Sequence, residues 1–208
     1  MDNPISSPLD SDYPRRGNAF SRWLASGFFR MAGWRVTNPM PAVPKAVIIG
    51  GPHTSNWDGI YTLAAMMQLG LDAHVMIKDS AFKGPFGAML RWMGALPIAR
   101  HKAGGVVEQT VAQFNSRDKL VMVVAPEGTR GGATQWKTGF YRIAEQAGVP
   151  IVLATADYRK KEITFARVIE PCGDMEKDLA EIFECYASIH PRHPDKLSAP
   201  LKALRERR

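Results

Sequence analysis

A strand, a glycine-rich turn and a helix follow one another directly in residues 46–71, and this order constrains the fold most strongly. The apolar run 46–49 ends in Gly50-Gly51-Pro52, which stops a strand in a turn. A periodic apolar segment begins at residue 60, preceded by the helix-start residues Ser55, Asn56 and Asp58. The pattern favours an α/β fold, with His53 in the loop and Asp58 in the first helical turn.

The placement of His53 and Asp58 decides whether their side chains can meet. Inside one helix, a five-residue step turns about 500°, which would leave the two side chains roughly 140° apart around the axis. With His53 in the loop, the chain can fold back so that a carboxylate oxygen accepts the imidazole Nδ1–H, and Nε2 is then free to take a proton from an alcohol. The same pair also fits a histidine in a turn beside a helix-capping aspartate.

A second strand pattern ends in another polar cluster. Residues 119–125 are almost all apolar and run directly into Pro126-Glu127-Gly128-Thr129-Arg130. Ligands of open α/β sheets bind outside the carboxyl ends of the strands. We therefore expect the loop at 126–130 to face the same crevice as His53 and Asp58.

Four ordered blocks carry a family resemblance. They are His-Thr-Ser-Asn-Trp-Asp (53–58), the apolar stretch 94–100 that ends in Arg100, Pro-Glu-Gly-Thr-Arg (126–130) and Val-Pro-Ile-Val (149–152). The first looks like an H-x-x-x-x-D motif, and the third matches a block usually written F-P-E-G-T-R. In this order the blocks resemble those of the glycerolipid acyltransferases, the family of 1-acyl-glycerol-3-phosphate acyltransferase.

The resemblance implies an O-acyltransferase. The expected reaction moves a fatty acyl group from acyl-CoA or acyl-carrier protein to the hydroxyl of a lysophospholipid acceptor, 1-acyl-glycerol-3-phosphate first of all. His53 would be the general base and Asp58 would orient it. Because no Ser or Cys stands in a nucleophile motif such as G-x-S-x-G, we expect direct attack by the alcohol, with oxyanion stabilisation from backbone N–H groups after Asn56. No cofactor and no metal is expected beyond the acyl thioester.

Loop cations provide a candidate phosphate clamp. Guanidinium groups match phosphate oxygens as planar forks and lysine adds a point charge, although each such cation also fits an ordinary surface residue. Glu127 is expected to position the glycerol or the Arg130 loop, and Lys78 ends a predicted strand at 73–78. The candidate substrate-binding residues are Lys78, Arg100, Lys102, Glu127, Gly128, Thr129 and Arg130.

Two departures from the family pattern leave the identity of the acceptor undecided. Ala99 stands where the resembled family often has Asp, and Ala125 where it often has Phe. Another lysolipid or an amino-acid-derived hydroxylipid is an alternative acceptor. A second alternative is a non-catalytic basic membrane-binding module. Nucleic acid is not expected as a partner, because the sequence has no recognition motif and no regular basic-aromatic stripe.

Composition fits one globular domain with anionic partners. The 208 residues are 45% hydrophobic and 23% charged, which suits a single domain with a central, largely parallel or mixed sheet flanked by helices. The net charge of +7 favours anionic partners, namely lipid headgroups, phosphorylated substrates, acidic carrier proteins or nucleic acid, and composition alone does not choose among them. Cys172 and Cys185 have no C-x-x-C spacing, which argues against a disulfide framework or zinc site and suits a reducing cytoplasm.

The N-terminal region divides into two expected parts before the acyltransferase domain at 37–208. Residues 1–16 are polar and predict a disordered leader, while 17–36 predict an amphipathic helix with a Phe/Trp stripe and several arginines. This helix can pack its stripe on the core, with Phe29 off the stripe and touching lipid, or lie in a bilayer surface. No apolar run is long enough to span a membrane, so we expect a cytoplasmic protein with peripheral contact to the inner, anionic membrane face.

The helix predicted at 60–71 is apolar on more than one face. We expect it to belong to the core. Met66 or Met67 is a candidate for lining an acyl-chain slot, because an unbranched methionine adapts to an apolar partner.

Overall fold

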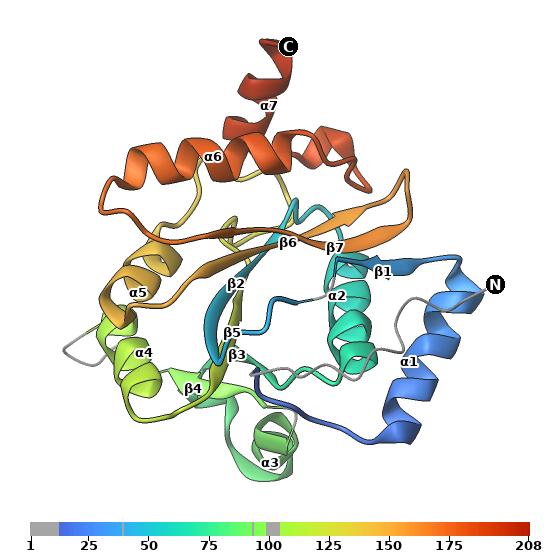
Figure 1. The fold of residues 1–208 in the computed structure, drawn as a ribbon, viewed down its shortest axis with the longest axis vertical. Helices are drawn as coiled ribbons and strands as arrows, with labels where there is room; N and C mark the ends of the chain where they lie inside the picture. Colours follow the sequence, from blue (N-terminus) through green and yellow to red (C-terminus); the bar gives the residue numbers. More distant parts are fainter. Residues whose placement is uncertain (1–12, 39, 93, 99–104) are drawn as a thin grey trace.

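A mixed sheet with helices on both faces forms the centre of the molecule (Figure 1). The computed structural model describes residues 13–208 except 39, 93 and 99–104. In this part of the chain, one seven-stranded sheet has the order β1-β7-β6-β2-β5-β3-β4. The strands are β1 (Arg35–Thr37), β2 (Lys45–Gly51), β3 (Ala73–Lys78), β4 (Leu96–Ile98), β5 (Leu120–Val124), β6 (Ile151–Asp157) and β7 (Glu162–Ile169). The predicted α/β class with a largely parallel or mixed sheet is confirmed.

The three central strands run parallel and end at one edge. β2 pairs with β6 on one side and with β5 on the other, both in parallel register. β3 and β4 continue in the same direction. β7 is antiparallel to β6, and β1 pairs in parallel with β7. The loops that follow β2, β5 and β6 therefore leave the sheet side by side.

Alternating side chains of the sheet fill two separate cores. On β2, Ala46 and Ile48 face the helices α1 (Ala19–Ala32) and α2 (Asn56–Leu69), while Val47 and Ile49 face the opposite layer. That opposite layer includes α4 (Gly105–Asn115), α5 (Gly139–Ala147), α6 (Met175–Ala187) and α7 (Ala199–Glu206) (Figure 1). Further short elements are α3 (Gly84–Trp92), η1 (Asp79–Ala81) and η2 (Pro194–Lys196). Burial on both faces explains why the central strands read as continuous apolar runs.

The N-terminal segments differ from the expectation in their limits. Of the predicted leader, residues 1–12 lie outside the described residues, whereas Tyr13 is buried and the Arg16 N–H donates to the carbonyl oxygen of Gly70 at 2.9 Å. The tyrosine ring packs on the core, so the segment at 13–16 contacts the folded domain. The predicted helix at 17–36 is shorter, because Gly33 takes a left-handed conformation and ends it, and Arg35 begins β1.

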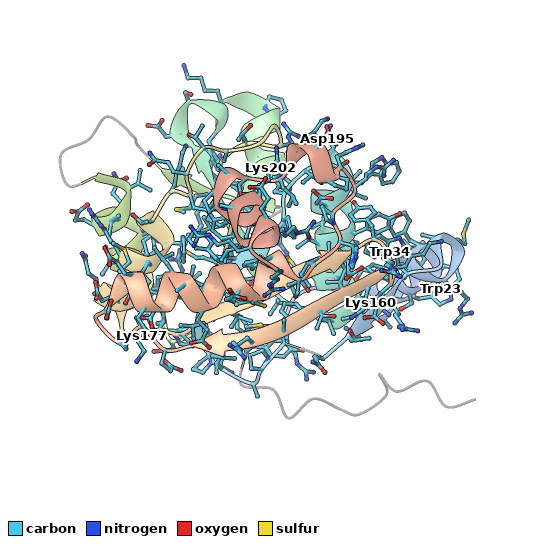
Figure 2. The ribbon with its side chains drawn as sticks, turned by 90° about the horizontal axis from the view of Figure 1, so that it is seen from above. Trp23, Trp34, Lys160, Lys177, Asp195 and Lys202 are labelled. Carbon is cyan, nitrogen blue, oxygen red and sulfur yellow. The ribbon has the colours of Figure 1, made fainter. Side chains whose placement is uncertain are left out.

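The apolar side chains that α1 and α2 bury against the core differ from those predicted. Phe29 was expected to touch lipid, but it is 2% exposed, whereas Trp23 and Met31 of the stripe are 68% and 91% exposed. Figure 2 shows Trp23 on the outer side of α1, whereas Trp34, which follows this helix, stacks on Tyr61 of α2 at a centroid distance of 4.0 Å. Helix α2 buries one face and exposes another, the exposed apolar residues being Trp57, Ile60, Leu63 and Met67. The two helices pack against each other, and both present uncovered apolar side chains.

No helix in the described part of the chain combines the length and the apolar character needed to cross a bilayer.

Candidate active site

The loop after β2 brings His53 and Asp58 together through the cap of α2. Ser55 is the N-cap, and Asp58, three residues on, reaches back to accept hydrogen bonds at Oδ2 from the N–H groups of Thr54 at 2.7 Å and Ser55 at 2.8 Å. This reciprocal capping folds the loop over the helix start. His53 Nδ1 then lies 3.4 Å from the same oxygen. The predicted placement of His53 in the loop and Asp58 in the first turn agrees with this geometry.

The Asp58 carboxylate is held in its charged form. Burial disfavours the charge, but hydrogen bonds from His53, from Tyr158 and from the loop amides outweigh it, so the pKa of Asp58 lies below its usual value. His53 is less enclosed, with 24% of its side chain exposed. A charged carboxylate at Nδ1 favours the imidazole tautomer that leaves Nε2 without a proton.

The loop after β5 contributes Glu127, whose contact differs from the one expected. Glu127 is 3% exposed, and both carboxylate oxygens lie 3.2 Å from the backbone nitrogen of His53. Glu127 therefore supports the His53 loop, a contact that the sequence did not predict, and its role in positioning the glycerol or the Arg130 loop stays a prediction. Burial raises the pKa of Glu127 to about 7, although the contact with His53 acts in the opposite direction.

Arg130 reaches the start of α2 from the same loop. Its side chain is exposed, and Nη1 donates to Oδ1 of Asn56, three residues from His53. Gly128 has a φ of 65°, and a Cβ there would lie 3.0 Å from Lys137 Cε and Nζ, so this turn needs glycine and places a lysine beside it. Thr129 Oγ1 accepts from the Gly131 N–H at 3.2 Å and thereby shapes the loop.

The structure describes little or nothing of the other candidate cations. Lys78 is the last residue of β3, at the carboxyl edge of the sheet, but its side chain is not among those described. Arg100 and Lys102 lie outside the described residues. Of the candidate substrate-binding set, the structure therefore brings Glu127 into contact with His53 and Arg130 into contact with the start of α2, while Gly128 and Thr129 lie between them in the chain.

An apolar cavity of about 350 Å³ opens beside His53 and Asp58. The two polar side chains lie in its wall, and most of the remaining lining is apolar. Met66 or Met67 was a candidate for lining such a cavity. Met66 lines it, whereas Met67 is exposed. Ala125, one of the two departures from the family pattern, is also part of the wall. The lining includes His53, Asp58, Leu63, Met66, Val75 and Ala125.

The backbone N–H groups proposed for an oxyanion hole already have acceptors. The Trp57 N–H donates to Ser55 Oγ at 3.2 Å, and the Asp58 N–H lies 3.3 Å from the Ser55 carbonyl oxygen. The capping arrangement that places Asp58 uses these donors. An oxyanion at residues 57 and 58 would have to compete with Ser55 for these N–H groups, and the expected oxyanion hole after Asn56 stays a prediction.

Tyr158 is a neighbour of the site that the sequence did not reveal. Its hydroxyl donates to Asp58 Oδ1 at 2.6 Å, and the Arg192 guanidinium lies 5.9 Å from the Tyr158 ring centroid and 5.4 Å from that of Trp57. Tyr158 comes directly after β6, and a polar residue just past the carboxyl end of a buried strand was the signal that could have found it. Among the described residues, no cluster of three metal-ligating side chains is present.

Comparisons with known proteins agree with this fold. A family model described as Acyltransferase matches residues 34–155. A 1-acyl-sn-glycerol-3-phosphate acyltransferase of Haemophilus influenzae is 28% identical over 183 residues, covering 82% of this chain and 71% of that protein. The crystal structure of the 1-acyl-sn-glycerophosphate (LPA) acyltransferase PlsC from Thermotoga maritima aligns with a TM-score of 0.57 at 14% identity, covering 80% of this chain and 75% of that one. The structural likeness concerns the fold.

Proposed function

Because this chain belongs to the acyltransferase family and is an O-acyltransferase, we propose that it acylates the free hydroxyl of a lysophospholipid, with 1-acyl-glycerol-3-phosphate as the acceptor. The similarity to the Haemophilus influenzae protein of that name supports this acceptor and a role in phospholipid biosynthesis. The observation that carries the proposal is the pairing of His53 Nδ1 with Asp58 Oδ2 at 3.4 Å in the wall of an apolar cavity.

His53 acts as the general base in the proposed reaction. Nε2 takes the proton of the acceptor hydroxyl while Asp58 stabilises the imidazolium that forms. The oxygen attacks the thioester carbonyl, and the C–O bond forms as the C–S bond breaks. The departing thiolate then receives the proton from His53, so the side chain returns to its starting state without a covalent acyl-enzyme.

The apolar cavity receives the fatty acyl chain. Its wall beyond His53 and Asp58 is built from aliphatic and small residues, which favour a chain without polar groups. The carbonyl end of an acyl chain inserted there would lie near His53. Unbranched Met66 adapts to the shape of a methylene chain.

Arg130 binds the anionic headgroup of the acceptor in this proposal. Its side chain is exposed and contacts Asn56, within a few residues of His53, and Lys137 lies beside the same loop. A planar guanidinium matches phosphate oxygens in two parallel hydrogen bonds. Lys78, Arg100 and Lys102 are the remaining candidates for the proposed clamp.

The acyl donor is acyl-CoA or acyl-carrier protein, used as a co-substrate without any further cofactor. Both carry a thioester, and the net charge of +7 favours either an anionic nucleotide or an acidic carrier protein. The alternative acceptors are another lysolipid or a hydroxylipid, with the same chemistry at His53.

The uncovered apolar side chains of α1 and α2 form a surface that rests on an anionic membrane in this proposal. Trp23 and Met31 of α1 and Leu63 of α2 are exposed, and Arg22 and Arg30 add positive charge on α1. Leu63 also lines the cavity, so the surface adjoins its mouth. An amphipathic surface of this kind partitions into the headgroup region, where a lysolipid acceptor resides.

A panel of acceptors tests the proposal. Purified protein is incubated with a radiolabelled acyl thioester, offered as acyl-CoA and as acyl-carrier protein, and with lysophosphatidate, lysophosphatidylcholine, lysophosphatidylethanolamine or a hydroxylipid. We expect labelled phosphatidate from lysophosphatidate and little product from the others. A strong signal with a different acceptor would support the proposed chemistry at His53 and would contradict 1-acyl-glycerol-3-phosphate as the acceptor. Transfer to none of them contradicts the proposed reaction.

A further inference from the structure

Tyr158 shares an edge of the sheet with His53 because their strands are parallel neighbours. β6 ends at Asp157 and β2 at Gly51, and the paired residues run in register as far as Gly51 opposite Thr155. We infer that Tyr158 is a positioning residue for acyl transfer, whose hydroxyl holds the Asp58 carboxylate so that Oδ2 faces His53 Nδ1. The inference rests on the proposed roles of His53 and Asp58.

The two oxygens of Asp58 have different partners. Oδ2 accepts from the N–H groups of Thr54 and Ser55 and lies next to His53, whereas Oδ1 accepts from the Tyr158 hydroxyl at 2.6 Å. The terminal torsion of an aspartate is broad, so a carboxylate bound at one oxygen only can rotate about its Cβ–Cγ bond. A donor on the second oxygen restricts this rotation and keeps Oδ2 directed at the imidazole.

Packing fixes the Tyr158 ring independently of its hydroxyl. The ring lies edge-on to Trp34 at a centroid distance of 4.8 Å and to Tyr61 at 6.1 Å. The Tyr158 N–H donates to the His190 carbonyl oxygen at 2.9 Å, and the Arg192 guanidinium lies against the ring. Because the ring is held by these contacts, the hydroxyl is directed at Asp58 before any substrate binds.

The hydroxyl remains a donor over the working pH range. Burial and the neighbouring Asp58 carboxylate hold the pKa of Tyr158 far above its usual value. A neutral phenol beside a charged carboxylate makes a charge-assisted hydrogen bond, which is stronger than one between neutral groups.

A second tyrosine–aspartate pair supplies a matched control. The Tyr141 hydroxyl donates to the buried Asp178 at 2.8 Å, between α5 and α6 and outside the cavity wall. Tyr158→Phe and Tyr141→Phe each remove one hydroxyl from a buried carboxylate and keep the ring. A purely structural role predicts that the two variants behave alike in activity.

Steady-state kinetics of the two variants form the first half of the test. We expect Tyr158→Phe to lower kcat roughly tenfold, because one charge-assisted hydrogen bond orients the base, with KM within about twofold of the wild type. Tyr141→Phe should leave kcat and KM unchanged. Equal kcat values for Tyr158→Phe and the wild type would overturn the inference.

The second half of the test measures the tautomer of the His53 imidazole in the absence of substrate. Nitrogen-15 NMR of the imidazole side chains at pH 8 reports which ring nitrogen carries the proton, and the His53 signals are assigned from their absence in His53→Gln. We expect the Nδ1–H tautomer in the wild type and in Tyr141→Phe, and a mixture of both tautomers in Tyr158→Phe. An unchanged tautomer in Tyr158→Phe contradicts the positioning role. The tautomer is measured without an acceptor, so this result does not depend on which lipid is acylated. The positioning role of Tyr158 and the proposed acceptor can therefore be refuted independently.

Discussion

Both carboxylate oxygens of Glu127 lie 3.2 Å from the backbone nitrogen of His53, so the loop after β5 holds the loop after β2 through its main chain. This contact joins two of the sequence blocks that carry the family resemblance. It supports the histidine without touching its ring. A carboxylate in this place is buried, and its ionisation therefore affects stability.

Glu127 should make the folded protein less stable as the pH rises. Its pKa is raised to about 7 from 4.5, so between these values the folded protein keeps a proton that the unfolded chain has lost. The free energy of unfolding then falls across this window, by on the order of 2–3 kcal/mol, and levels off above it. Urea unfolding at pH 5 and pH 8 measures the change. Glu127→Gln, which keeps an acceptor for the His53 N–H, should remove this part of the pH dependence, and an identical dependence in both proteins would refute the assignment.

Replacing Asp58 should slow the reaction far more than it harms the fold. Asp58→Asn removes the charge that stabilises the His53 imidazolium, so we expect kcat to fall by roughly 10²–10⁴ with a small change in KM. The control is Asp178→Asn, which alters a buried carboxylate that accepts from Tyr141 and from the Cys172 N–H. Thermal unfolding should show comparable losses of stability for the two variants. Equal activities for both would exclude a catalytic role of Asp58.

Ala125 should set the length of acyl chain that the cavity accepts. Ala125→Phe adds a ring to the cavity wall, which leaves less room for methylenes. Each methylene that no longer fits costs about 0.8 kcal/mol, or roughly fourfold in kcat/KM. We expect the variant to lose activity with long-chain thioesters and to keep it with short ones, measured over a series of chain lengths. Ala112→Phe, on the exposed side of α4, is the control, and a uniform loss over all chain lengths would argue against an acyl-chain cavity.

The exposed face of α1 should bind anionic vesicles. Trp23→Glu combined with Met31→Glu places charge where apolar side chains would enter the headgroup region, so we expect at least about tenfold weaker partitioning. Cosedimentation with vesicles containing phosphatidylglycerol measures the bound fraction. Val168→Glu changes an exposed apolar residue of β7 and should bind like the wild type. Unaltered binding of the double variant would show that α1 is not the membrane contact.

Local patterns in the sequence were sufficient for much of the fold. The apolar runs that became β2 and β5 are largely buried, and the residues at their ends determine the turns. The loop position of His53 and the helical position of Asp58 were predictable because capping depends on residues a few positions apart. Parallel strands place their ends together, so the joint position of the His53 and Glu127 loops was also predictable.

Contacts between distant residues could not be predicted in the same way. β1 has three residues and pairs with β7, which lies 127 positions further along the chain, so no periodicity signals it. The hydrogen bond from Tyr158 to Asp58 depends on which strand lies beside β2. Periodicity also identified the apolar stripe of α1 without indicating which of its sides the core would cover, and Phe29 was therefore assigned to the wrong side.

The most direct test compares His53→Gln with His74→Gln in transfer of a labelled acyl group to lysophosphatidate. His74 offers a matched control, because its Nε2 lies 3.6 Å from Asp72 in a second histidine–aspartate pair outside the cavity wall. Glutamine keeps hydrogen-bonding groups in place of the ring but cannot act as the base at neutral pH. We predict that His53→Gln loses at least about a hundredfold in kcat while remaining folded, and that His74→Gln keeps the wild-type rate. A folded His53→Gln protein that transfers the acyl group at the wild-type rate would contradict the account.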